Sequence, residues 1–130
     1  MIDLRTVTEV ALKVAADMPD ETYRKRFQRL RPEQWADFVD TGSERLNVPC
    51  EYKTPQGEPL CLVGVVLDRL GLLAEVPDAG AEAFDVEDVA RRFTPRAVAV
   101  LTDMQWRQDD YQDDPWEGII RDALGGATEA

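Results

Sequence analysis

Residues 60–72 read LCLVGVVLDRLGL, the longest nearly uninterrupted apolar stretch of the chain. The stretch is shorter than the roughly 20 apolar residues that a membrane span needs, and two charged residues interrupt it. Pro59 suits the first turn of a helix, and Gly71 suits the left-handed position that closes one. The stretch therefore predicts a central buried helix at about 60–70. Gly64, in its middle, indicates a close approach of another backbone.

Amphipathic segments on both sides of this stretch predict further helices. Apolar side chains recur at spacings of three and four residues in 6–18, 20–30, 32–41, 85–93, 94–110 and 115–124. Gly125 and Gly126 are expected to end the last of these helices. We therefore expect a mainly α fold, with about six helices packed around the central helix. The chain is expected to form a single globular domain over 1–124, followed by a frayed tail at 125–130.

A different pattern occupies 48–60, where short extended segments flank a Thr-Pro-Gln-Gly turn at 54–57. It predicts a small β-hairpin at about 50–60, which its prolines confine to an edge. A two-residue loop would place Cys50 opposite Cys61, within reach of a disulfide, whereas a bulge at Gly57 would shift the register by one residue. Because cytoplasmic thiols stay reduced, buried free thiols are the favoured interpretation.

The composition excludes several functional classes. The net charge is −11 and the chain contains no histidine. A surface of this sign repels nucleic acid and anionic membranes. Without histidine, hydrolases that need a histidine partner and zinc sites with histidine ligands are excluded. The N-terminus lacks the features of a secretory signal, so we expect a cytoplasmic protein without cofactor or membrane contact.

One segment, 20–31, carries a cluster of basic residues opposite an apolar face of three residues. This basic patch consists of Arg24, Lys25, Arg26, Arg29 and Arg31. Clustered cations are typical of contacts with phosphate or with an acidic partner. A solvated helix face that pairs with acidic residues elsewhere in the chain is the favoured alternative.

An acidic run between the last two expected helices raises the question of a cation site. The run contains Asp109, Asp110, Asp113, Asp114 and Glu117. A calcium loop needs alternating acids and a glycine, but Tyr111 occupies one ligand position and no glycine follows it. A solvated turn with helix-capping acids is favoured, so no metal site is predicted.

Two motifs resemble a group of small uncharacterised proteins of actinobacteriophages and actinobacteria. The first is a Cys-Leu-Val-Gly helix start at 61–64, preceded by Cys50 and Tyr52. The second is a Gln..Gln-Asp pattern followed by Pro-Trp, which here comprises Gln105, Gln108, Asp109, Pro115, Trp116 and Ile120. The resemblance covers roughly 48–124, and 20–47 departs from it. It implies a phage accessory protein and transfers no activity.

The motif residues allow two interpretations. In the first, Gly64 lets the central helix pack on the helix at 95–110, while the amides of Gln105 and Gln108 satisfy backbone groups where the hairpin enters the central helix. In the second, the motif residues form a binding pocket, which would consist of Tyr52, Cys61, Gln105, Gln108, Asp109 and Trp116. The structural interpretation is favoured, because pockets are few per protein.

Two classes of function follow. The leading hypothesis is a non-enzymatic phage protein that binds a host protein through its acidic surface, in one form as a mimic of DNA. The alternative is a small enzyme or ligand-binding protein whose pocket lies near Cys61, Gln105 and Asp109. Cys61 near a helix N-terminus would be its nucleophile, or Asp109 and Asp110 its acid and base, but a base partner for the thiol is missing. The net charge disfavours nucleic acid as the partner, and homo-oligomerisation stays open.

Overall fold

The computed structural model describes residues 1–40, 51–76 and 89–128 of the chain. These residues form six α-helices and one 3₁₀ helix: α1 (Leu4–Asp17), α2 (Tyr23–Leu30), α3 (Pro32–Asp40), α4 (Leu62–Arg69), η1 (Leu73–Glu75), α6 (Pro95–Asp110) and α7 (Trp116–Thr128). No strand occurs within the described ranges, so the expected mainly helical fold is confirmed. Among the helices described, none is long and apolar enough to cross a membrane.

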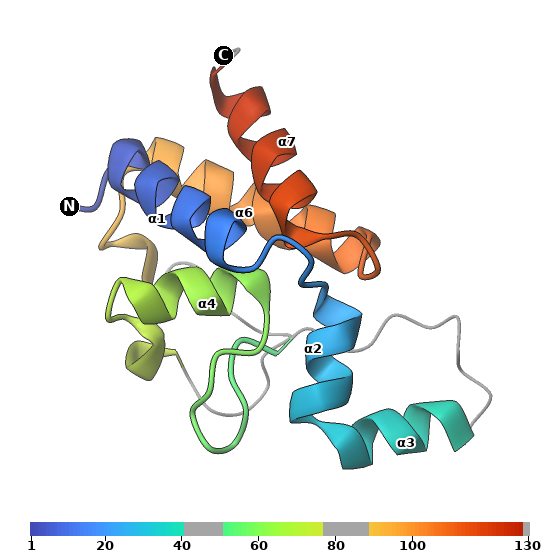
Figure 1. The fold of residues 1–130 in the computed structure, drawn as a ribbon. Helices are drawn as coiled ribbons and strands as arrows, with labels where there is room; N and C mark the ends of the chain where they lie inside the picture. The colour runs from blue at the N-terminus through green and yellow to red at the C-terminus, as the bar shows by residue number, and fades with distance from the viewer. Residues whose placement is uncertain (41–50, 77–88, 129–130) are drawn as a thin grey trace.

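The main body is built on α1 and α6, which lie side by side (Figure 1). α7 packs across one side of this pair, and α4 packs against the other side. Local signals fix the ends of both helices: Asp3 accepts a hydrogen bond from the Thr6 amide at 2.9 Å, and the Thr94 side chain caps α6 in front of Pro95. These capped starts hold the apolar faces of α1 and α6 against their neighbours.

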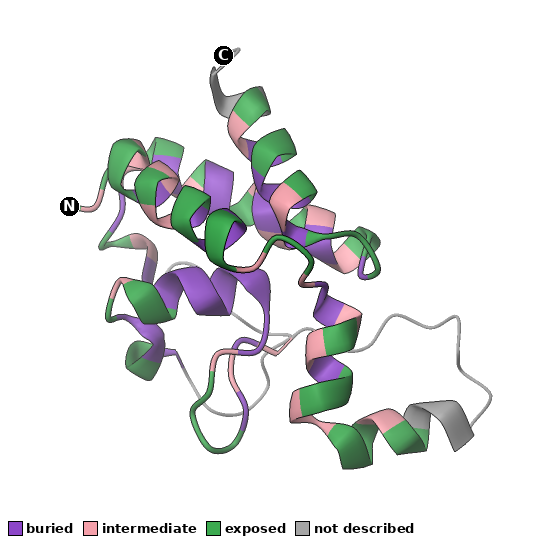
Figure 2. Cartoon of the chain, in the orientation of Figure 1, coloured by how far each residue is buried: buried purple, intermediate pink, exposed green. Residues whose placement is uncertain are grey.

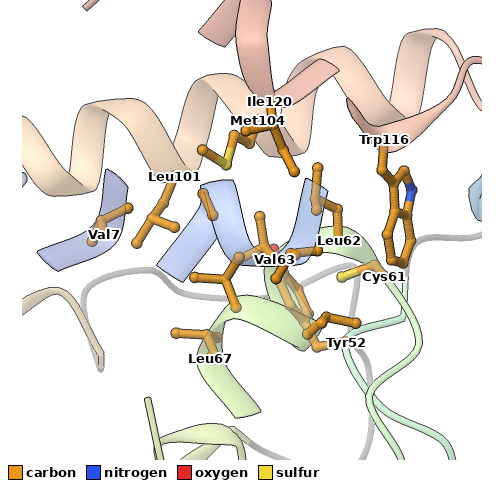
Figure 3. Close-up of a cluster of buried hydrophobic side chains, with 14 of the residues drawn as sticks. Val7, Tyr52, Cys61, Leu62, Val63, Leu67, Leu101, Met104, Trp116 and Ile120 are labelled. Atoms are coloured by element: carbon orange, nitrogen blue, oxygen red, sulfur yellow. The ribbon is translucent and has the colours of Figure 1, made fainter. Parts of the chain in front are cut away.

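A single core fills the space between these four helices. Val7 of α1, Leu62 of α4, Met104 of α6 and Ile120 of α7 are fully buried and point toward one another (Figure 3). The buried residues follow the inward faces of the helices, while α3 is exposed or half-buried wherever its side chains are described (Figure 2). The core therefore belongs to α1, α4, α6 and α7, and α2 joins it through Tyr23 and Phe27.

The apolar stretch forms a helix, but the prediction that the other helices surround it is wrong. α4 has eight residues, which correspond to a length of about 12 Å. A helix of this length cannot contact six neighbours, and α4 covers only one side of the α1 and α6 pair. Residues 62–67 are nevertheless all buried, because η1 and the chain at Tyr52 cover further sides of the helix. Gly71 closes the helix with a φ of +76°, as predicted.

The predicted β-hairpin is also wrong. Lys53 and Pro59 form one isolated antiparallel bridge, and no strand is present among residues 51–60. The register is the one shifted by a residue, because Gly57 adopts a φ of +86° and the Tyr52 carbonyl accepts from the Leu60 amide at 3.0 Å. Pro59, on the returning side, has no backbone N–H to donate and limits further pairing.

One predicted helix end is contradicted by the structure, and two further expectations concern residues that the structure does not describe. α7 continues through Gly125 and Gly126 to Thr128, so the predicted helix end at these glycines is wrong. A glycine ends a helix by turning left-handed, and among the described glycines only Gly57 and Gly71 have a positive φ. Cys50 and the expected helix start at Asp85 lie outside the described residues.

Candidate functional site

The motif residues of α6 meet the start of α4 in a cluster of four side chains, those of Cys61, Gln105, Gln108 and Asp109. Asp109 Oδ1 accepts from Gln105 Nε2 at 3.0 Å and from Gln108 Nε2 at 3.3 Å. Both amides therefore present their oxygens to α4. We call this group the α4 clasp, because it fixes α6 to the first turn of α4.

Gln108 makes the shortest contact of the clasp. Its side chain is fully buried, and its Oε1 accepts from the Leu62 backbone N–H at 2.7 Å. That N–H lies in the first turn of α4, where no carbonyl of the helix can reach it. The prediction that Gln108 satisfies a backbone group at the entry to the helix is confirmed. Gln105 serves a different group, the Cys61 thiol.

Cys61 is the N-cap residue of α4. Its Sγ accepts from the Gly64 N–H at 3.3 Å and lies 3.7 Å from Gln105 Oε1, to which the thiol donates. The residue has 0% exposure and carries a free thiol. The bridge pairs Lys53 with Pro59, a register that aligns Glu51 with Cys61. The thiol therefore acts as a buried capping group, and its position gives no support to a nucleophile.

The reaction of the Cys61 thiol with a small alkylating agent tests this assignment. In a Cys50→Ser variant, we expect the folded protein to react at least about 100-fold more slowly than the urea-unfolded chain, because a buried thiol reacts only after local opening. The rate is measured by mass spectrometry at neutral pH. A folded-state rate close to that of the unfolded chain would show that the thiol is accessible and would revive the enzyme alternative.

Gly64 is the one described glycine that another segment approaches closely. A Cβ atom placed on Gly64 would lie 2.1 Å from the backbone oxygen of Tyr52. The predicted close approach is thus present, but its partner is the chain at Tyr52 and not the helix at 95–110. The reason is that the bridged turn at 53–59 folds back over α4.

Trp116 does not belong to the clasp. The indole is fully buried at the start of α7, and the Arg26 guanidinium lies over its ring at 5.7 Å from the centroid. The six residues of the predicted pocket therefore separate into three places. Four form the α4 clasp, Tyr52 covers Gly64, and Trp116 packs toward α2.

The basic patch is engaged with groups of the same chain. Arg24 donates to Asp113 at 2.6 Å, Arg29 to Glu21 at 2.7 Å, and Arg31 lies 3.3 Å from Glu51. Arg26 donates twice to the Pro59 carbonyl, at 2.7 and 3.0 Å, and once to Glu21. Lys25 donates to the Asp20 carbonyl. These contacts favour the interpretation in which the patch pairs with acids of its own chain.

An apolar cavity next to the clasp was not predicted from the sequence. It has a volume of about 180 Å³ and lies between α4, α6 and the segment at 89–93. Its lining includes Tyr52, Val63, Phe93, Leu101 and Gln105, of which Tyr52 and Gln105 were predicted pocket residues. Trp106 also borders it, with 68% of its surface exposed. Its one sequence signal is the spacing of Val98, Thr102, Gln105 and Trp106, which share one face of a helix.

A second, wider hollow lies where α6 turns into α7. This groove has a volume of about 610 Å³, and its apolar lining residues include Pro19, Pro115 and Ile119. Its charged lining consists of Asp20, Asp114, Glu117, Asp122, Arg107 and Arg121. Both arginines are paired, Arg107 with Asp103 at 2.9 Å and Arg121 with Glu117 at 3.2 Å. We call it the acidic groove.

Neither metal sites nor known relatives add to this description. Within the described residues, no three acidic or cysteine side chains lie together in a way that could hold a metal ion. Comparison of the chain with protein-family models, with curated proteins and with solved structures gave no match. The two hollows and the charge distribution are therefore the features from which a function can be argued.

Proposed function

We propose that this chain is a non-enzymatic binding module that holds a positively charged surface of a host protein, in the cytoplasm of an infected actinobacterial cell. The observation that carries the proposal is the acidic groove. Its arginines are neutralised by their own acidic partners, whereas Asp20, Asp114 and Asp122 add negative charge to the lining. A cationic partner is the complement of such a surface.

The charge balance of the whole chain supports this proposal. The chain has 26 acidic and 15 basic residues, which leaves an excess of 11 acids. Arginine–carboxylate contacts do not change this excess, but they determine where on the surface it acts, because a paired arginine is less available to an external anion. The hydrogen bond from Arg107 to Asp103 raises the pKa of that guanidinium. Asp20, Asp114 and Asp122 of the groove are exposed and steer cationic partners.

The alternative, an enzyme or ligand-binding protein at Cys61, Gln105 and Asp109, gains no support from the geometry of the clasp. The donors and acceptors that would serve a substrate already bind one another and the start of α4. Cys61 has no exposed surface through which a substrate could reach the sulfur. The clasp stabilises the fold, and the exposed acidic groove is left as the candidate for function.

Charge reversal in the groove tests the proposal. The native protein and an Asp114→Lys/Asp122→Lys variant are immobilised, an actinobacterial lysate is passed over each with and without nuclease, and retained protein is eluted with rising salt. We expect one host protein to be retained with or without nuclease at about 50 mM salt. It should elute from the variant at clearly lower salt than from the native protein, because the groove carboxylates contribute to its binding.

The matched control is Glu33→Lys/Asp37→Lys on α3. It changes the net charge by the same amount at exposed positions that do not line the groove. We expect this control to elute its protein at the same salt as the native chain. Loss of retention after nuclease would assign the contact to nucleic acid, and no retention at low salt would remove the proposal. Competition by duplex DNA for the retained protein would support the form in which the chain mimics DNA.

A further inference from the structure

We propose that the cavity beside Trp106 receives one aromatic or large aliphatic side chain from the docking segment of a cationic protein partner. The inference rests on the proposed function, since it names where that partner is anchored. It assigns to the apolar cavity and the exposed indole a role that the acidic groove does not have. Two independent features carry it, the size of the cavity and the exposure of the tryptophan.

The cavity has the size and the lining of a side-chain pocket. Its volume of about 180 Å³ slightly exceeds the roughly 150 Å³ of an apolar cavity that holds one benzene molecule. Val63, Leu67, Phe93 and Leu101 supply an apolar wall from three different segments. One phenylalanine or leucine side chain therefore fits the space, and a larger group does not.

The rim of the cavity argues for a protein and against a free small molecule. Trp106 is 68% exposed, and Thr102, one helical turn before it, is exposed on the same face of α6. A molecule confined to the cavity would contact only the part of Trp106 that lines it and would leave the rest of the side chain in water. Only a partner surface that extends beyond the cavity covers both, and tryptophan is enriched among residues that dominate protein interfaces.

The charges around the rim favour positive residues beside the anchor. Arg92, next to the lining residue Phe93, is bound to Glu75, and Arg107 is bound to Asp103. Asp110, one turn after Trp106, is exposed. The exposed indole face can also take a lysine or arginine through a cation–π contact. The partner segment is thus expected to place its apolar anchor between basic residues.

Two synthetic peptides test the proposal on the full chain. Both are fluorescently labelled Lys/Arg heptapeptides, one with a central phenylalanine and one with a central serine, and their dissociation constants are measured by anisotropy at about 50 mM salt. We expect the native protein to bind the phenylalanine peptide about tenfold or more tightly than the serine peptide. The Trp106→Ala variant should lose this ratio, because its affinity falls more for the phenylalanine peptide than for the serine peptide.

A control variant and a second substitution at the mouth of the cavity test whether the preference for phenylalanine depends on the cavity. Leu12→Ala removes another exposed large apolar side chain, outside the lining of both hollows, and should keep the ratio. Thr102→Phe places a ring at the mouth of the cavity and should abolish the ratio with Trp106 still present. Equal, salt-sensitive affinities of the native protein for both peptides would overturn the anchor while leaving the proposed function intact. Binding of neither peptide would overturn both.

Discussion

Replacement of Gly64 by alanine is expected to destabilise the protein by about 3 kcal/mol, at the upper end of what overpacking of a core costs. The added Cβ atom would lie 2.1 Å from the Tyr52 oxygen, far inside contact distance. That oxygen belongs to the backbone, so no side-chain rotation relieves the clash. It also accepts the Leu60 N–H at 3.0 Å, and a shift of Tyr52 would break this bond.

Urea unfolding followed by circular dichroism measures the effect of the Gly64 substitution. The matched control is Gly118→Ala, in the first turns of α7, where an added Cβ would meet no atom within 4 Å. This control should stabilise the protein by up to about 1 kcal/mol, because alanine favours a helix over glycine. Similar changes for both variants would mean that the Tyr52 backbone does not lie against Gly64.

The need for a close approach at Gly64 could be read from the sequence, whereas the partner could not. A glycine in the middle of an apolar helix signals that something needs the missing side chain. Which segment approaches depends on the whole tertiary arrangement, here on the turn at 53–59. The same limit explains the error about the position of α4. Apolar periodicity shows which face of a helix is buried, but not how many neighbours cover it.

Local signals were more informative. The start of α6 at Pro95, the buried stripe of α1 and the end of α4 at Gly71 all depend on residues within one or two helical turns, and all were predicted. The predicted hairpin was wrong because Pro59 limits pairing beyond the single bridge, and the sequence left the register open because it depends on the backbone conformation of Gly57. The predicted end of α7 was wrong because a glycine pair permits a helix to end but does not require it.

The candidate site likewise contains features that the sequence predicts and features that it does not. Gln108 could be singled out because it belongs to the Gln..Gln-Asp motif, and a buried amide must find a partner. The cavity beside Trp106 could not be found, since its wall comes from four segments that lie far apart in the sequence. The pairing of the basic patch was anticipated in kind, but contacts such as Arg24 to Asp113, 89 positions apart, require the folded chain.

Replacement of Gln108 by leucine is the second large effect that we expect, a destabilisation of about 3 kcal/mol. Leucine has a similar volume but cannot accept the Leu62 N–H, and a buried donor without a partner costs about 1 to 3 kcal/mol. The Asp109 carboxylate also loses the N–H that Gln108 donates to it. Urea unfolding measures the loss. Gln34→Leu, at an exposed position of α3, is the matched control and should stay within about 0.5 kcal/mol of the native protein.

A Gln108→Glu variant separates the missing hydrogen bond from other causes of instability, since it keeps an acceptor for the Leu62 N–H. The introduced carboxyl group is buried beside Asp109, and both conditions raise its pKa in the folded state above its unfolded value of about 4.3. Below the unfolded pKa the group is neutral in both states, so stability relative to the native protein is retained there. As the pH rises above that value, the unfolded chain ionises more readily, and the variant loses stability. Unfolding midpoints measured between pH 4 and pH 7 should therefore fall for Gln108→Glu relative to the native protein. A difference independent of pH would show that residue 108 is not enclosed by the clasp.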